Sequence, residues 1–596
     1  MQLVDTQFPV NLALRDASQS QQLQVHTVDT GAGHLVENLL EAGVDTWFGV
    51  PGGPIMPLFD AIIRSGRARL VESRHETNAV FAAMGYYRST GRVPGIVVTA
   101  GPGATNALTG IAAAHCERVP MLIITGDVAW AANGGVLLQS MGPDGLNIEA
   151  VFKPVTRATI RVAHQRSASA QTLAALQAAQ EPNNPGPALV VLPVQCGSGE
   201  SRPVTLKRGR KVAQCTVGDD LLVDVADRLA SARRPLIIVG AACRRFAKTV
   251  TRLVETLRVP FMTTPQAKGV ISEEHPLSLR NGGMAASWWS RRYTAPGVDV
   301  ALAIGTDLDD VSIGPTPPVG PGGFLIHVDT NPAVFNRNQS THLGIDCDLT
   351  AFAKELTRVA MARASHNPYA AAPLADARRR SPFDYENFRE DNREVITPHR
   401  AVHDLERAAP EATFLTDIGE HMLFGLHYLT AKGPDRFAIH LGLGSMGSGI
   451  CSAIGHAYGD SSRRYICICG DGGMQMVGSE VLVAVKHKLP VVFAIFNDAR
   501  YNMVYHGYKQ QFGRENPWET PWVEFAQWAA SMGIPSARIE KPGQISQMLL
   551  DNLAAQAGGG PVVLDIRIDP QVRIQGAGRV EALQRMSTGE FPIIKR

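Results

Sequence analysis

The sequence predicts an α/β protein built from three doubly wound, parallel-sheet domains. Short Val- and Ile-rich runs that end at Gly or Asp alternate with helical patterns in three long segments, 28–195, 218–361 and 397–570. Strands that alternate with helices indicate parallel sheets covered by helices on both faces. The chain of 596 residues is long enough for about three domains of ordinary size. Its 45% hydrophobic content is sufficient to form large buried cores.

The remaining stretches lack this alternation. Residues 1–27 are polar and mixed, without the basic start and apolar middle of a signal peptide, so we expect a loose N-terminal arm. Segments 196–217 and 362–396 are polar and basic and are predicted to be linkers between domains. Residues 571–596 are predicted to form a C-terminal tail.

Composition excludes several functional classes. The 57 basic and 55 acidic residues leave a net charge of +2, which favours neither nucleic acid nor an anionic membrane as a partner. No apolar run approaches the ~18 residues that a membrane-spanning helix needs. The eight cysteines form no CxxC pair, so we expect reduced thiols and a cytoplasmic protein.

One stretch of the third segment carries the strongest sign of chemistry. The apolar run 465–469 predicts a strand that stops at the Gly-Asp-Gly-Gly of 470–473, and a helical stretch leads to a second strand, 491–496. Asp471 follows the first strand and Asp498 follows the second. Parallel sheets bind ligands at the carboxyl ends of their strands. Glycines allow a close approach of a phosphate, and paired carboxylates suit Mg²⁺, although a Gly-rich turn with two surface aspartates would look similar.

The first segment has its own set of loops at strand ends. Glu76 begins a helical pattern directly after a short apolar strand, and Gly-rich loops occur at 49–57 and 99–106. An acid at the start of a helix is often only a partner of the helix dipole. Three such loops in one unit nevertheless indicate the rim of a site.

These motifs together resemble the acetolactate synthase group of thiamine-diphosphate enzymes, most closely the catabolic type that works without FAD. The resemblance extends from about residue 28 over nearly the whole chain. The matching pieces, in chain order, are Pro51-Gly-Gly-Pro-Ile-Met-Pro57, Arg74-His75-Glu76, Gly101-Pro-Gly-Ala-Thr-Asn106, Gly126-Asp127, Thr416-Asp-Ile-Gly-Glu-His421, Gly442-Leu-Gly-Ser-Met-Gly447, Gly470-Asp471-Gly472, Asn497-Asp498 and Tyr501-Asn-Met-Val504.

The resemblance assigns a role to each domain and to the catalytic groups. It implies a pyrimidine-binding domain, a central domain and a diphosphate-binding domain. Glu76 is expected to contact N1′ of the aminopyrimidine, so that the cofactor can form its carbon nucleophile. Gln139 is expected beside the active site, and Met446 is expected to wedge the cofactor into its bent shape.

The resemblance also implies the binding residues. Mg²⁺ would be held by Asp471, Asp498 and the main-chain carbonyl of Arg500. A substrate pocket would be lined by Gly52, Gly53, Leu138, His506 and Gly507. The cofactor would be bound by Ile418, Gly419, Glu420, His421, Gly444, Met446, Gly470, Asp471, Gly472, Gly473, Met474, Asp498, Arg500, Tyr501, Asn502 and Met503.

In that family the aminopyrimidine and the diphosphate are bound by different subunits. The resemblance therefore implies a homodimer as the smallest active unit, with a homotetramer as the expected assembly.

Three positions depart from the family pattern. Asp498 stands where the family has Asn, and Glu420 stands where it has Gln. Gly507 occupies the position of a Trp, which leaves room for a larger substrate.

The segment 307–314 lacks both arginines of the flavin-binding marker, and 239–243 lacks a GxGxxG fingerprint, so we expect no FAD.

The expected function is that of a carboligase. A 2-oxo acid, with pyruvate as the first candidate, would lose CO₂ and add as an acyl-anion equivalent to a second carbonyl compound. A decarboxylase without ligation, an FAD-dependent oxidase and an inactive cofactor-binding subunit are the alternatives.

Overall fold

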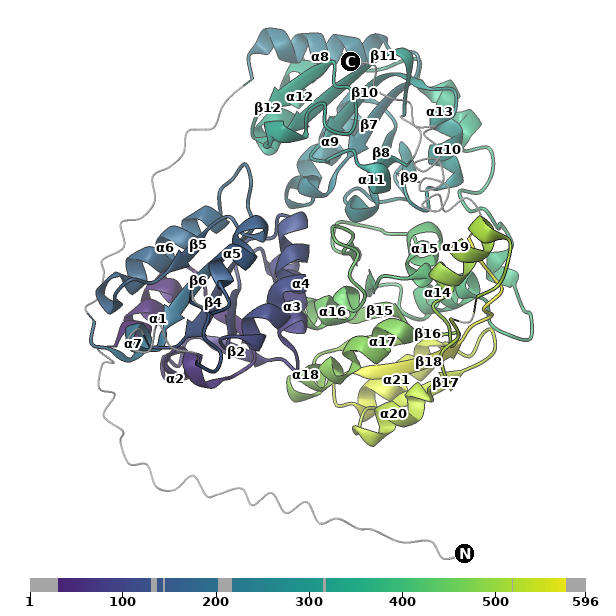
Figure 1. Ribbon diagram of the computed structural model, residues 1–596. Coiled ribbons are helices and arrows are strands. Elements are labelled where there is room, and N and C mark those ends of the chain that lie inside the picture. The colour runs from purple at the N-terminus through teal and green to yellow at the C-terminus, as the bar shows by residue number, and fades with distance from the viewer. Residues whose placement is uncertain are drawn as a thin grey trace, which may run out of the picture.

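A computed structural model of the chain describes residues 30–129, 137–142, 145–201, 217–314, 318–516 and 518–574 (Figure 1). It contains three sheets of six strands each, and all paired strands run parallel. The predicted α/β class with three parallel sheets is confirmed. None of the helices in these ranges is long and apolar enough to cross a membrane.

The first sheet has the strand order β2-β1-β3-β4-β6-β5. Its strands are β1 (Thr46–Gly49), β2 (Arg69–Glu72), β3 (Gly95–Val98), β4 (Met121–Asp127), β5 (Thr159–Arg161) and β6 (Pro187–Pro193). The helices of this domain are α1 (Gly31–Glu41), α2 (Met56–Arg64), α3 (Glu76–Thr90), α4 (Pro102–Cys116), α5 (Ile148–Phe152), α6 (Ala168–Ala179) and α7 (Val194–Ser198). Neighbouring strand residues such as Trp47 and Phe48 enter different buried cores, so the sheet is covered on both faces.

The central sheet has the order β12-β11-β10-β7-β8-β9. Its strands are β7 (Pro235–Val239), β8 (Phe261–Thr263), β9 (Ser278–Asn281), β10 (Val298–Ile304), β11 (Val319–Asp329) and β12 (Leu343–Asp346). The helices around it are α8 (Asp219–Ser231), α9 (Ala247–Leu257), α10 (Trp288–Thr294), α11 (Asp310–Ile313), α12 (Leu349–Ala362) and α13 (Ala371–Ala377). This order is the doubly wound arrangement of dinucleotide-binding folds.

The third sheet has the order β14-β13-β15-β16-β18-β17. Its strands are β13 (Thr413–Thr416), β14 (Phe437–Ile439), β15 (Tyr465–Gly470), β16 (Val491–Asn497), β17 (Ser536–Ile539) and β18 (Val562–Arg567). Its helices are α14 (Pro398–Ala408), α15 (Glu420–Tyr428), α16 (Ser448–Gly459), α17 (Asp471–Val477), α18 (Val481–Lys486), α19 (Asn502–Phe512), α20 (Phe525–Ser531) and α21 (Gln547–Gln556).

The first and third sheets share one topology. When the strands are numbered within each domain, both follow the order 2-1-3-4-6-5, whereas the central sheet follows 6-5-4-1-2-3. The three segments have a similar alternation of strands and helices in sequence. The strand order relates the two outer units more closely to each other than to the central one.

Helices α3 and α16 join the first domain to the third (Figure 1). Glycines permit their close approach: a Cβ on Gly455 would lie 1.7 Å from the carbonyl oxygen of Ala82, and one on Gly85 would lie 2.1 Å from that of Ser452. Buried side chains of both domains form one continuous core at this contact.

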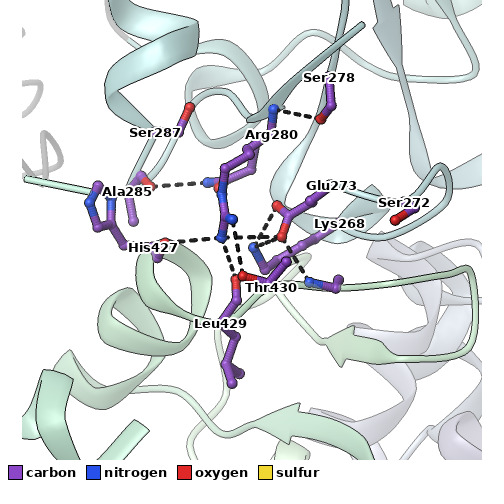
Figure 2. A network of polar contacts seen from close by, with 12 residues as sticks. Lys268, Ser272, Glu273, Ser278, Arg280, Ala285, Ser287, His427, Leu429 and Thr430 are labelled. Atoms are coloured by element: carbon purple, nitrogen blue, oxygen red, sulfur yellow. Dashed lines mark hydrogen bonds and ion pairs between the residues drawn. The ribbon is translucent and has the colours of Figure 1, made fainter. Parts of the chain in front are cut away.

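A buried ionic network joins the central domain to the third domain (Figure 2). The Lys268 ammonium donates to both carboxylate oxygens of Glu273, at 2.6 and 2.8 Å, and both side chains are almost fully buried. The Arg280 guanidinium lies 3.3 Å from Glu273 and donates to the carbonyl of Leu429 and the hydroxyl of Thr430. Arg280 and Glu273 thus anchor this charged cluster on the backbone of the third domain.

The segment predicted as a second linker packs against the central domain. It contains α13, and two of its arginines stack on tryptophans: Arg378 lies 4.3 Å from the ring centre of Trp289, and Arg380 lies 4.4 Å from that of Trp288. The predicted N-terminal arm and most of the first linker and of the tail lie outside the described residues.

Candidate active site

Three aspartates follow three neighbouring strands of the third sheet. Strand β15 pairs with β13 on one side and β16 on the other. Asp417 follows β13, Asp471 follows β15 and Asp498 follows β16. The chain reverses its winding direction between β13 and β15, and open parallel sheets bind ligands at such a point. The side chains predicted to hold a metal therefore lie at the edge where this fold binds ligands.

Asp471 and Asp498 lie close enough for their charges to interact. Burial raises the pKa of Asp471 to about 6. Burial also raises the pKa of Asp498 well above its usual range, and the charges of Asp471 and Glu420 add to the effect. Asp471 Oδ1 accepts the N–H of Gly472 at 2.8 Å, but its buried Oδ2 has no hydrogen-bond partner within the described chain. A cation between these carboxylates would remove the repulsion.

Glycines after β15 keep the backbone uncovered. A Cβ on Gly472 would lie 2.7 Å from the ring of Tyr501 and 3.2 Å from the terminal methyl of Met446. A Cβ on Gly473 would lie 2.4 Å from Asp417 Oδ2. Side chains at these positions would therefore fill the space in which a phosphate group could approach the main chain. The neighbouring Met474 is buried.

His421 carries a second unpaired polar atom at this edge, its Nε2, among the residues described. The ring is buried beside Gly470, whose Cβ position lies 3.0 Å from Nδ1. Burial lowers the pKa of His421 to about 4, so the imidazole is neutral at pH 7. Its Nε2 is buried and has no hydrogen-bond partner among the residues described. A neutral ring in this position can donate one hydrogen bond to an anion. Ile418 and Gly419 form the turn that leads to it.

Asp417 has a role that the sequence motifs did not reveal. Its buried carboxylate accepts the N–H groups of Gly447 and Gly449, both at 2.9 Å, while burial raises its pKa to about 6. These bonds hold the end of the loop that carries Gly444, which has φ +72°, and Met446. One sequence feature could have indicated this role. Asp417 comes directly after a buried strand, where burying a carboxylate without hydrogen-bond donors would cost free energy.

The start of α19 is anchored by Arg500 and Asn502. Arg500 Nε donates to Asn502 Oδ1 at 3.0 Å, and both side chains donate to the carbonyl oxygen of Pro570. The guanidinium also lies 3.8 Å from the ring centre of Tyr505. The side chain of Arg500 is thus committed to structure, and its carbonyl is the group predicted to bind the metal. Met503 packs against the adjoining core.

Glu420 and His506 form a pair at the same edge. His506 Nδ1 lies 2.8 Å from Glu420 Oε1, and the side chains are 12% and 10% exposed. The other carboxylate oxygen of Glu420 is buried and unpaired within the described part of the chain. Sequence motifs placed Glu420 near the cofactor and His506 in the substrate pocket, but they did not indicate that the two side chains touch. Gly507 follows His506 and is half-buried.

The first domain presents its candidate residues at the equivalent edge of its own sheet. Glu76 is the first residue of α3 and is buried. Its Oε2 accepts the side-chain amide of Asn106 on α4 at 3.0 Å. Asn106, the last residue of the motif 101–106, therefore orients Glu76, a role that the motif did not indicate. A Cβ on Gly52 would lie 2.4 Å from Thr99, so the two Gly-rich loops lie against each other at the strand ends.

Gln139 lies near this edge in a left-handed conformation, with φ +63°. Its Cβ lies 3.1 Å from the Cβ position of Gly101, which places it beside the loop after β3. Leu138 is 90% exposed, and Gly53 has open space around its Cβ position. The candidate residues thus form two groups, one on each outer domain. Among the described residues, Glu76 makes its side-chain hydrogen bond within its own domain.

The residues of the third domain suit a metal-bound diphosphate. Asp471 Oδ2, Glu420 Oε2 and His421 Nε2 are buried without partners, and the glycines leave main-chain groups accessible. No cluster of three His, Cys, Asp or Glu side chains that could hold a metal occurs in the described ranges. A metal here would need two carboxylates, a carbonyl and oxygens from the ligand itself, which is the usual arrangement for Mg²⁺.

Family models match all three domains in order. The N-terminal, central and C-terminal domains of thiamine pyrophosphate enzymes match residues 29–148, 222–356 and 417–566, respectively. The first and last are described as the parts that bind thiamine pyrophosphate. They contain Glu76 on one side and Asp471 with Asp498 on the other.

Similar proteins cover nearly the full chain. A Mycobacterium tuberculosis protein named "Putative acetolactate synthase large subunit IlvB2" is 30% identical over 90% of this chain and 98% of its own length. The acetolactate synthase of Arthrospira platensis is 29% identical over 90% and 94% of the two chains. The acetolactate synthase isozyme 1 large subunit of Escherichia coli is 26% identical over 91% and 95%. The chain belongs to the thiamine pyrophosphate enzymes and is an enzyme of the acetolactate synthase type.

Proposed function

We propose that the protein is a carboligase that decarboxylates a 2-oxo acid, with pyruvate as the donor, and joins the remaining acyl unit to a second carbonyl compound. The observation that carries this proposal is the edge of the third sheet, where the charges of Asp471 and Asp498 interact and the buried Oδ2 of Asp471 is left unpaired within the described chain. Relatives that cover nine-tenths of the chain are named acetolactate synthases, which supports ligation as the reaction.

Each side chain has a defined task in this proposal. Thiamine diphosphate, when bound, supplies the carbon nucleophile and electron sink that protein side chains lack. Glu76 would form the hydrogen bond to N1′ of the aminopyrimidine, and Asn106 would hold the carboxyl group in place. Met446 would support the cofactor, and His421 Nε2, which is buried without a partner in the described chain, would face a phosphate oxygen. Gln139, Gly52, Gly53 and Leu138 face the substrate.

Asp471, Asp498 and the Arg500 carbonyl would hold Mg²⁺. The main chain of residues 418–421, 470–474 and 501–503 would bind the diphosphate, with Gly444 shaping the loop that carries Met446. The second carboxylate at Asp498 increases the negative charge around the metal, so we expect tight binding of a divalent ion. The two outer domains would follow the predicted boundaries, 28–195 and 397–570.

A second copy of the chain would complete the site, as a homodimer at minimum and a homotetramer as the full assembly. Large apolar side chains near the two groups of candidate residues are exposed in the single chain, which supports a protein partner there. They are Leu138, Leu443, Met476, Tyr501 and Val504. Cys196, Cys243, Cys451, Cys467 and Cys469 are buried free thiols, which supports the proposed cytoplasmic location.

We propose that the central domain works without FAD. Asp307 follows β10 and Asp329 is the last residue of β11, beside the crevice where a dinucleotide would bind in this fold. Arg118 of the first domain lies 2.8 Å from Asp307 and 3.9 Å from Asp329. Two carboxylates tied to a neighbouring domain would repel a dinucleotide phosphate. A purified protein with a flavin absorption band would contradict this proposal and would favour an FAD-dependent oxidase.

The test is product analysis with thiamine diphosphate and Mg²⁺. Pyruvate is supplied alone and then with larger 2-oxo acids or aldehydes, while CO₂ and the ligated products are quantified. We expect one ligated product per CO₂, with larger acceptors used because Gly507 leaves space. Glu76→Gln is expected to abolish ligation while cofactor binding persists. Release of a free aldehyde without ligation would establish the simple decarboxylase instead.

A further inference from the structure

We propose that His506, held in position by Glu420, provides the hydrogen-bonding group for the carbonyl oxygen of the acceptor. The proposal deepens the carboligase function and rests on it. His506 would be a catalytic residue and Glu420 a positioning residue. Both act on the second substrate, whichever 2-oxo acid or aldehyde that substrate is.

The Glu420–His506 pair lies beside the candidate metal site. Glu420 opens α15, after β13, and His506 lies on α19, after β16. These two strands flank β15, at whose end Asp471 lies. The contact between His506 Nδ1 and Glu420 Oε1, at 2.8 Å, therefore joins the helices on both sides of the candidate metal site.

The hydrogen bonding of the pair leaves one nitrogen of the His506 ring available. Within the described chain, the His506 ring has no hydrogen bond besides the one to Glu420. When Nδ1 donates to the carboxylate, Nε2 is the nitrogen left for a ligand, and its orientation is fixed by the carboxylate. Glu420 Oε2 is buried without a donor in the described chain, which is costly. A purely structural link between the two helices would not explain this unpaired oxygen.

The surroundings give an acceptor access to this ring. The neighbour Gly507 carries no side chain and is half-buried, and His506 itself is 12% exposed. A ring that is shielded but reachable can contact a bound molecule without being fully hydrated. The missing side chain at Gly507 leaves room for the body of the acceptor.

In the proposed step, formation of the carbon–carbon bond is accompanied by proton transfer to the acceptor oxygen. The electron pair released when CO₂ leaves the donor ends in the new bond to the carbonyl carbon of the acceptor. The π electron pair of that carbonyl moves onto its oxygen, which takes a proton from Nε2 of the protonated ring. The Nδ1 hydrogen bond to Glu420 persists throughout, and Nε2 regains one proton from water for each CO₂ released.

The experiment compares His506→Leu, His506→Gln and Glu420→Gln in the full-length protein loaded with thiamine diphosphate and Mg²⁺. Pyruvate is the donor, and the acceptors are pyruvate itself and benzaldehyde, one anionic and one neutral. First-turnover CO₂ release and ligated product are measured separately. Lys509→Gln is the matched control, because Lys509 lies on the same helix and forms its ion pair at the surface, with Glu515 at 2.9 Å.

We expect His506→Leu to release CO₂ at nearly the original rate while ligated product per CO₂ falls by about 100-fold, the usual contribution of a general acid. His506→Gln restores a donor without a transferable proton, so the acceptor KM should recover while kcat stays low. Glu420→Gln should show a smaller loss, since its amide oxygen can still accept from Nδ1. An effect on both acceptors places the contact at the carbonyl oxygen, whereas an effect on pyruvate alone would place it at the carboxylate and overturn the proposal.

Two results separate this proposal from the proposed function. If the unaltered protein ligates and His506→Leu ligates equally well per CO₂, the role of His506 is refuted and the carboligase stands. If the unaltered protein releases CO₂ without forming a carbon–carbon bond, the carboligase function fails, and the role of His506 fails with it. Thermal unfolding of each variant shows whether it is folded, and His506→Gln decides the matter should the leucine variant unfold.

Discussion

Single residues show how strongly charge is concentrated at one sheet edge. Asp417, Asp471 and Asp498 are all buried, and burial raises the pKa of each. Asp417 is stabilised by two backbone N–H groups. The other two carboxylates lack comparable compensation within the protein, so a bound cation is what would make their arrangement favourable.

Asp498→Asn is expected to stabilise the metal-free protein. The substitution removes one of two buried like charges, so we expect a gain of about 1–3 kcal/mol, the desolvation cost of one buried polar group. Thermal unfolding at pH 7.5 in a chelator measures it. With Mg²⁺ and thiamine diphosphate added, the unaltered protein should gain more than the variant, because it offers the metal an extra charge. A variant that is less stable in the chelator would contradict the repulsion.

Glu117→Gln tests a buried carboxylate whose pKa is lowered, in contrast to the raised pKa values of the three aspartates. Burial alone would raise the pKa of Glu117, but Arg88, at 2.5 Å, together with His440 and the N–H of Gly442, lowers it to about 2. Burial lowers the pKa of His440, so its ring is neutral at pH 7 and contributes an N–H, while Arg88 supplies the positive charge.

A lowered carboxyl pKa stabilises the fold above the unfolded-state value of about 4.3, and this contribution is lost as the pH falls toward 2. Glu117→Gln should therefore cost about 3 kcal/mol at pH 6, and the difference from the unaltered protein should shrink steadily below pH 4. Denaturant unfolding across this range is the measurement. A difference that does not depend on pH would show that packing, and not charge, gives Glu117 its effect.

Among the secondary-structure elements, the crossing of α3 and α16 has the greatest consequence. Helix α3 begins with Glu76, and α16 follows the loop that carries Met446. Their close approach therefore sets how the acid-bearing helix of one domain lies against the other domain of the same chain.

Gly455→Ala is expected to disrupt this crossing. The added Cβ would lie 1.7 Å from the Ala82 carbonyl oxygen, and backbone cannot move aside as a flexible side chain can. We expect a loss of about 1–3 kcal/mol or more in the free energy of unfolding. Gly433→Ala is the matched control, because the nearest atom to its Cβ position is 4.0 Å away. Equal stability of the two variants would refute the steric argument.

At the scale of the whole molecule, domains are joined by buried charge as well as by apolar packing. In the network of Figure 2, Glu273 also accepts the N–H of Ala431 at 2.8 Å, which ties the central domain to the third. Burial lowers the pKa of Lys268 to about 8. An ion pair in such surroundings is costly to break from one side, because the remaining charge stays buried.

Lys268→Met should therefore destabilise the protein by about 3–5 kcal/mol, and Lys268→Met combined with Glu273→Leu should cost less than the single change. Denaturant unfolding followed by two probes, one in the central domain and one in the third, also reports whether the domains still unfold together. Additive losses in the double variant would show that the two side chains do not act as a pair.

Much of the fold was predictable because it depends on local patterns. The run 465–469 became β15 (Tyr465–Gly470), and 491–496 became β16 (Val491–Asn497). The helical stretch expected between these two strands begins at Asp471, directly after β15, and is interrupted at Gly478–Glu480. Its Gly-rich first turn resembles a loop in sequence, but an acidic first residue next to the free N–H groups allows a helix to start there.

The candidate site was only partly predictable, because several contacts join residues far apart in the chain. Asn106 orients Glu76 from another helix, and Asp417 holds the loop of Met446 from across the strand ends. Motif spacing placed these residues in one region without indicating which side chains touch. The exact domain limits and the cofactor contacts remain predictions.

The sequence by itself determined the fold class, the family and the strand ends where chemistry would occur, because hydrophobic periodicity and Gly-Asp turns act over a few neighbouring residues. Only the tertiary structure decided that Glu420 meets His506, and that Glu117 joins the first domain to the loop of the third. Such pairs form because strands far apart in sequence end at one edge, where buried polar atoms must find partners.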